Sequence, residues 1–149
     1  MVIRKYRSSD CNAIVQLFYD TVHSVNAKDY TNEQLGVWAT GSEDVEEWNA
    51  KFLESYAVVA VENGVFIGFG NIENSGYLDM LYVHKDYQRK GVASAICDEL
   101  EKTTYKNSIT TYSSITAKPF FEQRGYRIIK ENEIERNGIT LKNYLMKKC

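Results

Sequence analysis

The residues best suited to chemistry lie in one turn, residues 88–93, which joins an apolar segment to an amphipathic one. The turn reads Q-R-K-G-V-A, so two cations, Arg89 and Lys90, precede a glycine. The first N–H groups of a helix have no partner inside it and lie at the positive end of its dipole, so a helix that begins here can bind an anion. Gly91 lacks the Cβ that would hold a phosphate away from those amides, and Ala93 is small as well. The turn therefore predicts a phosphate-binding helix start.

Two other phosphate-binding patterns are absent from the sequence. It contains no G-x-x-x-x-G-K-[ST], the pattern of a P-loop, and no G-x-G-x-x-G, the pattern of a dinucleotide-binding fold. A nucleotide bound in either of those two ways is therefore not supported, and the phosphate site must belong to another class.

A single carboxylate, Asp79, lies inside the apolar segment before the turn. Residues 76–84 read G-Y-L-D-M-L-Y-V-H, which is typical of a mostly buried strand. Alternation along a strand puts Asp79 on the same face as Leu81 and Val83, and Tyr82 on the other face. Apolar neighbours raise the pKa of a carboxyl group, which suits a general base. The alternative is a structural Asp that bonds to nearby backbone, but a charge in a central strand is costly without a use. We therefore favour the base.

Composition favours one globular domain over residues 1–149, 44% hydrophobic and 26% charged. The formal net charge of −2 offers no general attraction to nucleic acid or to an anionic membrane, and no apolar run is long enough for a membrane span. The 3 cysteines are odd in number and form no C-x-x-C pair, which favours reduced thiols in the cytoplasm. With 2 isolated histidines they predict no metal site.

Periodicity and turn residues predict the elements that must position the turn and Asp79. Asn63-Gly64 and Asn137-Gly138 are strong two-residue hairpin turns between strands. The predicted order is a strand at 2–6, helices within 8–55, three antiparallel strands at 56–62, 65–71 and 76–84, a helix after Gly91, a strand at 109–113, a short helix within 117–125, and a terminal hairpin at 126–147. The fold class is therefore α/β, with a mostly antiparallel sheet flanked by helices.

The strand, the Q-x-x-G-x-A turn and the helix together resemble the acetyl-CoA-binding motif of the GCN5-related N-acetyltransferase (GNAT) superfamily. Residues 117–126, A-K-P-F-F-E-Q-R-G-Y, also resemble the signature A-x-x-F-Y-E-x-x-G-F of that superfamily. The order of elements is similar along essentially the whole chain. The resemblance implies a GNAT fold and transfer of an acetyl group from acetyl-CoA to an amine, by direct attack in a ternary complex, without a metal.

The resemblance also implies which residues bind acetyl-CoA. Amides of the turn and helix start hold the pyrophosphate, and the main chain of Leu81 and Val83 pairs with the pantetheine arm as an extra strand would. The N–H of Leu81 can also polarise the thioester carbonyl, where negative charge develops in the transition state. The full set of implied cofactor-binding residues is Leu81, Tyr82, Val83, Gln88, Arg89, Lys90, Gly91, Val92, Ala93, Ser94, Ala117, Phe120 and Phe121.

The acceptor pocket is expected in the aromatic helical region at residues 26–55, because the corresponding region of the superfamily is variable and shapes the substrate site. Thr31 and Gln34 form a capping box that begins a short helix. The alternative for these aromatics is a small satellite core, which we favour for Trp48. We name Tyr30, Gln34 and Trp38 as candidate substrate-binding residues, and a compact small-molecule amine as a better match than a protein amine.

The chain departs from the family signature at two positions. Phe121 stands where the superfamily usually has the tyrosine that protonates the departing thiolate, and Ser114 stands where Asn is common. Phenylalanine cannot give a proton, so Tyr112, Tyr126 or a water must do so, or the thiolate leaves without a dedicated acid. The candidate catalytic residues are Asp79 and Tyr112, with Glu73 a weaker alternative base.

The missing tyrosine keeps a second class of function open, a non-catalytic acyl-CoA-binding module of the same fold. Acetyl-CoA-dependent release of thiol in the presence of an amine separates this class from an enzyme. Nucleic-acid binding is disfavoured by the net charge. The terminal hairpin has an open edge that can pair with another subunit, so both a monomer and a homodimer are compatible with the sequence.

Overall fold

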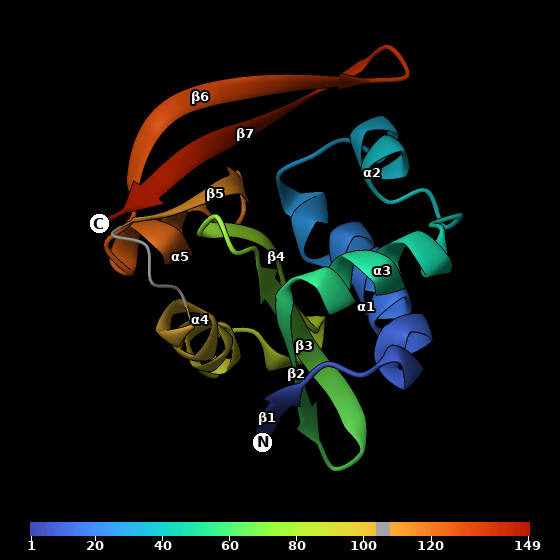
Figure 1. Cartoon of the computed structure of the whole chain (residues 1–149). Coiled ribbons are helices and arrows are strands. Elements are labelled where there is room, and N and C mark those ends of the chain that lie inside the picture. The colour runs from blue at the N-terminus through green and yellow to red at the C-terminus, as the bar shows by residue number, and fades with distance from the viewer. Residues whose placement is uncertain (104–107) are drawn as a thin grey trace.

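A seven-stranded mixed sheet forms the centre of the computed structural model, which describes residues 1–103 and 108–149 (Figure 1). The strand order is β1-β2-β3-β4-β5-β7-β6, and all neighbours are antiparallel except β4 and β5. The strands are β1 (Val2–Lys5), β2 (Tyr56–Glu62), β3 (Val65–Ile72), β4 (Tyr77–Val83), β5 (Ile109–Ser114), β6 (Arg127–Arg136) and β7 (Ile139–Lys148). This arrangement confirms the predicted mixed sheet with its three consecutive antiparallel strands.

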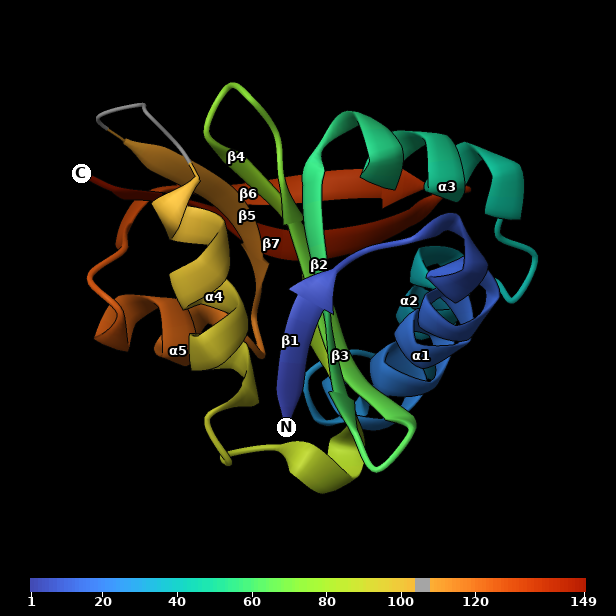
Figure 2. The same ribbon diagram turned by 60° about the horizontal axis from the view of Figure 1, so that its bottom comes forward.

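Helices cover both faces of the sheet (Figure 2). One face carries α1 (Cys11–Ser24), α2 (Asn32–Trp38) and α3 (Val45–Glu54), and the other carries α4 (Val92–Lys102) and α5 (Lys118–Gln123). Each face has its own apolar core, the first around Phe18, Phe52 and Phe69 and the second around Ile96, Leu100 and Met146. Short 3-10 turns occupy Ser8–Asp10, Asn26–Lys28 and Lys85–Tyr87. β4 therefore has an apolar core on each of its two faces.

Local turn chemistry explains where several elements begin and end. Asn63 and Gly64 have φ of 51° and 78°, and Asn137 and Gly138 have φ of 50° and 80°, the positive values that a two-residue hairpin turn requires. The Thr31 hydroxyl accepts the Gln34 N–H at 3.2 Å, and the Gln34 side chain accepts the Thr31 N–H at 2.9 Å. The predicted hairpin turns and capping box are thus confirmed.

Helix α4 packs unusually close to β3, at two glycines. A Cβ at Gly70 would lie 2.9 Å from the carbonyl oxygen of Met80 and 3.0 Å from the Ile96 side chain. A Cβ at Gly68 would lie 3.0 Å from the same isoleucine. The missing side chains let α4 sit directly on the sheet, which fixes where its N-terminus points.

Among the described residues, no helix is long and apolar enough to cross a membrane.

Candidate active site

The parallel pairing of β4 with β5 is very short, so these two strands diverge. Tyr77 pairs with Thr110 and Leu78 pairs with Thr111, and the two strands form no pair beyond these within the described chain. The Thr111 hydroxyl donates to the Leu78 carbonyl oxygen at 2.8 Å, which fastens the last paired position. We call the space where the strands separate the wedge. The rest of β4 therefore has one edge without a strand partner.

Asp79 lies at the apex of the wedge, in a β-bulge. Leu78 pairs with Ile72 and Met80 pairs with Asn71, so β4 has one extra residue, Asp79, between two successive residues of β3. The buried Asn71 side chain supports this bulge, because its Oδ1 accepts the Met80 N–H at 3.0 Å. Bulges re-aim side chains and are common beside active sites. The bulge thus sets the direction of the Asp79 carboxylate.

The prediction that Asp79 shares a face with Leu81 and Val83 was wrong. Leu81 and Val83 pack in the core on the α4 side, whereas Asp79 lines a pocket on the opposite face together with Met80 and Tyr82. Strict alternation fails here because the extra residue of a bulge shifts the face of everything after it. The carboxylate therefore faces the same side as Tyr82.

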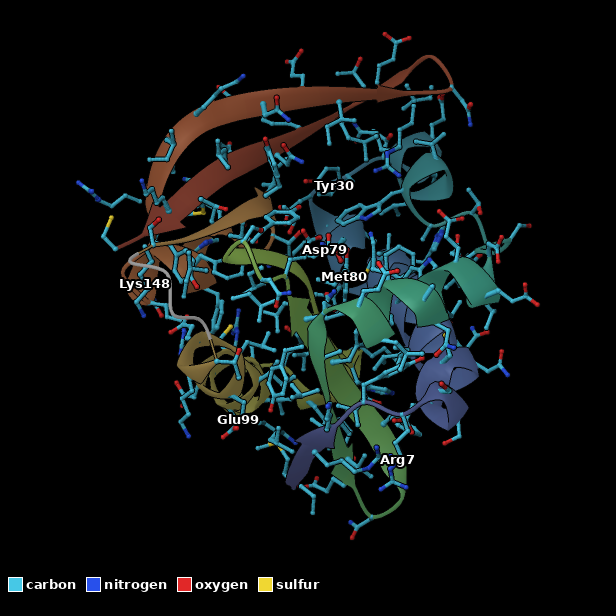
Figure 3. The ribbon with its side chains drawn as sticks, in the orientation of Figure 1. Arg7, Tyr30, Asp79, Met80, Glu99 and Lys148 are labelled. Carbon is cyan, nitrogen blue, oxygen red and sulfur yellow. The ribbon has the colours of Figure 1, made fainter. Side chains whose placement is uncertain are left out.

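The pocket has a volume of about 510 Å³ and is lined by residues from many of the helices and strands. It lies between α1, α2 and α3 on one side and β4, β5 and the β6–β7 hairpin on the other, with Asp79 and Tyr30 inside this space (Figure 3). Its walls carry aromatic rings, including Trp38, Trp48, Tyr77, Tyr82 and Tyr112. Its polar groups include Asp79 from the sheet, Lys51 from α3 and Arg136 from the hairpin. We call it the aromatic pocket.

Inside the aromatic pocket, Asp79 forms an ion pair with Lys51. Its side chain is 12% exposed, and its Oδ2 lies 3.2 Å from the Lys51 Nζ, which is itself 47% exposed. No hydrogen bond satisfies that buried oxygen among the described residues. A carboxylate oxygen held only by a half-exposed lysine remains available to an incoming donor. This geometry suits a group that must accept a proton.

Two of the three predicted substrate-binding residues line the aromatic pocket. Trp38 and Tyr30 both do, with their rings packed edge to face at 5.1 Å. The Tyr30 hydroxyl donates to the Lys142 carbonyl oxygen at 2.7 Å and accepts the Ile115 N–H at 3.0 Å, so it also holds the hairpin in place. Gln34 does not line the pocket, because its side chain caps α2 and donates to the Thr140 carbonyl oxygen at 2.8 Å. Gln34 thus connects α2 to β7.

The open edge of β4 exposes backbone donors to the wedge. The Met80 N–H bonds to Asn71 and the His84 N–H bonds to Ile67, so both point toward β3. Successive N–H groups of a strand point to opposite edges, so those of Leu81 and Val83 point into the wedge. These are the two residues that the sequence assigns to a pantetheine arm.

Beyond the wedge, the turn at residues 88–93 leads into the start of α4. The Gln88 side chain donates to the Val83 carbonyl oxygen at 2.6 Å, which ties the turn to the end of β4. Gly91 has φ of 81°, and no atom lies within 4 Å of the position of a Cβ there. The first helical bond runs from the Ala95 N–H to the Gly91 carbonyl oxygen, so three N–H groups precede it, those of Val92, Ala93 and Ser94. The helix start is thus open to an anion.

The two cations of the turn stand beside this helix start. Arg89 adopts φ of 61°, an uncommon left-handed conformation for a residue with a side chain. The Lys90 Nζ lies over the Tyr87 ring, 5.4 Å from its centroid. Both side chains are exposed, and they add positive charge next to the open amides.

The second family signature forms α5 and packs against the core below the wedge. Phe121 is 3% exposed and stacks edge to face with Phe120 at 5.2 Å and Tyr126 at 5.0 Å. The Ser114 hydroxyl accepts the Ala117 N–H at 3.0 Å, so it helps begin the turn into the helix. The residue that replaces the family tyrosine is therefore a packing residue.

The structure separates the two tyrosines that were considered as proton donors. Tyr112 is 47% exposed and lines the aromatic pocket, where its ring packs edge to face with Tyr77 at 6.1 Å. Tyr126 is buried on the other face, and its hydroxyl donates to Glu101 at 2.8 Å. Burial and the Glu101 carboxylate raise the pKa of Tyr126. Tyr126 is therefore committed to a structural contact.

The sequence reasoning missed Lys51, Tyr77 and Arg136 as pocket residues. Lys51 had a weak signal, because it follows Trp48 by three positions and so lies on the same face of α3. No sequence signal identifies Arg136 as a pocket residue, because the sequence predicts a hairpin but not where the tip of that hairpin lies in the fold. No group of three potential metal ligands occurs among the described residues.

Comparison with known proteins agrees with the architecture of this site. A family model described as an acetyltransferase (GNAT) domain matches residues 26–148. The chain is 35% identical over 146 residues to YafP of Escherichia coli (strain K12), an uncharacterized N-acetyltransferase, with 97% of this chain and 93% of that protein covered.

Solved structures agree as well. A GCN5-related N-acetyltransferase from Rhodopseudomonas palustris superposes with a TM-score of 0.93 at 31% identity, covering 99% of this chain and 94% of that one. The PaiA N-acetyltransferase of Thermoplasma acidophilum, solved with coenzyme A, superposes with a TM-score of 0.78 at 17% identity. The superposition covers 99% of this chain and 97% of that one. The matched family model and these relatives of similar length show that the chain belongs to the GNAT acetyltransferase family.

Proposed function

We propose that this protein transfers an acetyl group from acetyl-CoA to the amine of a small molecule. The observation that carries the proposal is the alignment of three features along β4: the Asp79 carboxylate at the apex of the wedge, the free edge at Leu81 and Val83, and the open start of α4 at Gly91. Together they provide a base, a partner for an extended arm and a phosphate site in that order.

The residues present fit acetyl-CoA. The Leu81 and Val83 amides can bond to the amide groups of a pantetheine arm as a neighbouring strand would, because both point into the wedge. The helix start at Gly91 offers unpaired N–H groups in free space to a pyrophosphate, with Arg89 and Lys90 beside it. The coenzyme A complex of the PaiA structure supports this assignment at the level of the fold.

Asp79 prepares the acceptor in the proposed reaction. An amine is protonated near neutral pH, so Asp79 takes a proton from the bound ammonium, directly or through a water. The freed nitrogen lone pair then forms a bond to the acetyl carbon, while the Leu81 N–H donates to the carbonyl oxygen that becomes negative. The C–S bond breaks and CoA leaves as a thiolate. Tyr112, which lines the same pocket, gives its proton to the thiolate and takes in return the second proton that the nitrogen loses as it becomes an amide.

A thermal melt with acetyl-CoA tests the cofactor site. A ligand at about one hundred times its Kd stabilises the folded state by roughly 2.7 kcal/mol, which raises the Tm of a chain this size by several degrees. We expect this rise for the wild type and its loss in Gly91→Glu, because the new carboxylate fills the anion site. Gly64→Glu is the matched control, since Gly64 also has positive φ, 78°, and free space around its Cβ position.

Turnover then separates an enzyme from a binding module. We expect acetyl-CoA-dependent release of thiol with a panel of small amines. A Tm rise without thiol release from any amine would support the non-catalytic acyl-CoA-binding module instead. A Tm that acetyl-CoA leaves unchanged in the wild type would contradict both.

A further inference from the structure

The Lys51–Asp79 pair constrains what kind of amine the aromatic pocket accepts. The proposed base holds a lysine ammonium at 3.2 Å before any substrate arrives. An incoming substrate ammonium must take the place of Lys51 at the carboxylate. Lys51 then remains in the pocket wall as an unpaired cation close to a second cation, and like charges at this distance repel. A purely cationic amine is therefore a poor occupant.

The other charged groups of the pocket strengthen this constraint. Glu43 accepts the Thr40 N–H and hydroxyl, both at 2.9 Å, so it is already committed within its own loop. The Lys142 Nζ is paired with Glu131 at 2.7 Å. Arg136 also lines the pocket, and no carboxylate of the described chain lies within 4.0 Å of its guanidinium. Beyond the Lys51–Asp79 pair, Arg136 is therefore a cation of the pocket lining that remains available to a substrate anion, whereas the Glu43 carboxylate is held by its own loop.

The remaining lining of the pocket selects for an apolar body. Trp38, Trp48 and Tyr82 contribute rings to the walls, and Met80 contributes an apolar side chain from β4. A volume of about 510 Å³ accommodates a compact molecule with a ring. Aromatic pairs prefer edge-to-face or offset contacts, which this arrangement of rings offers to an aromatic ligand.

We infer that the acceptor is an amine that carries its own carboxylate and an aromatic body, as an aromatic α-amino acid does, and that Lys51 is the residue that selects it. This inference rests on the proposed acetyl transfer. On binding, the substrate ammonium pairs with Asp79 while Lys51 moves to the substrate carboxylate, so both members of the original ion pair keep a partner. Arg136 favours the same anion from the hairpin side.

The reaction is the acetyl transfer described above, applied to this acceptor. Asp79 takes one proton from the ammonium, the nitrogen forms a bond to the acetyl carbon, and the C–S bond of acetyl-CoA breaks. The nitrogen loses a second proton as it becomes an amide, and CoA, which leaves with the electron pair of the C–S bond, takes up one proton through Tyr112. The product is an N-acetyl amino acid, which keeps its carboxylate but has lost its positive charge. Its neutral amide no longer pairs with Asp79, so Lys51 can return and favour product release.

Matched pairs of acceptors test this inference. L-Tryptophan and tryptamine share one ring system and differ in the carboxylate, as do L-phenylalanine and phenethylamine. For the wild type we expect kcat/KM for each amino acid to exceed that of its decarboxylated partner by about tenfold or more, the effect of one charge-assisted contact. In Lys51→Met we expect this ratio to fall several-fold toward one, because Arg136 alone then attracts the substrate carboxylate. A general structural defect would lower both rates without changing the ratio.

Lys5→Met serves as the matched control, because Lys5 is exposed on β1 and does not line the pocket. This variant is expected to keep the wild-type ratio of kcat/KM between each amino acid and its decarboxylated partner.

Calorimetric titration of L-tryptophan and tryptamine into the CoA-bound protein measures the preference for the carboxylate without turnover.

Several outcomes overturn the inference while leaving acetyl transfer intact. These are equal or better use of the decarboxylated amines by the wild type, an unchanged ratio in Lys51→Met, or thiol release only with amines of other classes. Absence of thiol release with every amine, despite a Tm rise with acetyl-CoA, would instead refute the proposed function. In that case tighter calorimetric binding of tryptamine than of L-tryptophan would refute the acceptor class as well.

Discussion

Asp79 and Met80 both face the aromatic pocket, because β4 contains one residue more than β3 at that point. The bulge lets Leu78 before it and Leu81 after it both pack under α4, while the Asp79 carboxylate stays out of that core, where a charge is costly to bury. The bulge is supported by Asn71, whose amide nitrogen donates to the Ser55 hydroxyl at 3.1 Å while its oxygen holds the Met80 N–H. A buried asparagine therefore positions the proposed base from the strand behind it.

Replacement of Asp79 tests its proposed role as the base. Asp79→Asn keeps the shape of the side chain but removes its ability to take a proton, so we expect kcat to fall by about 10²- to 10⁴-fold. Measurement of thiol release at saturating acetyl-CoA and acceptor checks this. Asp20→Asn, on the exposed side of α1, is expected to leave the rate unchanged. A wild-type rate in Asp79→Asn would contradict its role as the base, and a lowered Tm with that rate would assign the carboxylate a structural role instead.

At the scale of elements, the position of α4 depends on the two glycines of β3. Gly68 and Gly70 leave room for Ile96 and Leu100, so the helix axis lies close to the sheet. The N-terminus of α4 is thereby placed just beyond the end of β4, where the turn is tied by Gln88. A shift of α4 away from the sheet would move the phosphate site relative to the wedge.

Two alanine substitutions test whether Gly70 is needed for the close packing around it. They compare this crowded glycine with a helical glycine that has free space around it. Gly70→Ala forces its Cβ against backbone at 2.9 Å and is expected to lower the free energy of unfolding by about 1–3 kcal/mol. Gly36→Ala, inside α2 with nothing within 4 Å of its Cβ, is expected to raise it by up to about 1 kcal/mol. Thermal or urea unfolding measures both. Equal effects of the two substitutions would show that α4 does not need the glycine.

At the scale of the whole molecule, one polar cluster joins segments far apart in the sequence. Glu101 at the end of α4 accepts hydrogen bonds from Arg124 at 2.8 Å, from Tyr126 at 2.8 Å and from Lys148 at 3.1 Å. Arg124 also donates to Asp98 at 2.6 Å. The cluster fastens α4 to the chain after α5 and to the end of β7, on the side away from the aromatic pocket.

This cluster makes stability depend on pH in a defined direction. Burial of Glu101 acts to raise its pKa, but the bonds from Arg124, Tyr126 and Lys148 outweigh it, so the pKa lies below the usual value of 4.5. A lowered folded pKa means that the stabilisation is present above pH 4.5 and is lost as pH falls through the folded pKa. We expect Glu101→Gln to lower the free energy of unfolding by about 2 kcal/mol at pH 7.

The difference between wild type and Glu101→Gln should shrink as pH falls below 4.5, because the wild-type carboxyl then becomes neutral too. Unfolding curves recorded from pH 7 to pH 3 measure it. Glu99→Gln is the control, since Glu99 pairs with Lys102 at the surface and its replacement is expected to change stability little at any pH. A difference that stays constant across this range would contradict the ionic role of Glu101.

The fold and the glycine-led start of α4 could be predicted because their signals are local. The Asn-Gly turns, the Thr31 capping box and the glycine before α4 each act within a few residues, so periodicity and turn chemistry identify them. The bulge at Asp79 was not predictable in this way. It is a mismatch in length between two paired strands, and the sequence of neither strand alone shows it. The Lys51–Asp79 pair and the place of Arg136 likewise depend on long-range packing, which one sequence does not reveal.

The wedge also bears on how this protein avoids aggregation. A strand edge with free N–H and C=O groups normally invites pairing with strands of other chains. The free edge of β4 lies in the interior of the molecule, between β3 and the strands beyond the wedge (Figure 2). Another polypeptide strand cannot approach it side by side without displacing β5, whereas a thin, flexible chain can enter from the open end. The protein thus keeps unpaired hydrogen-bond donors in a sheet without presenting them to its neighbours.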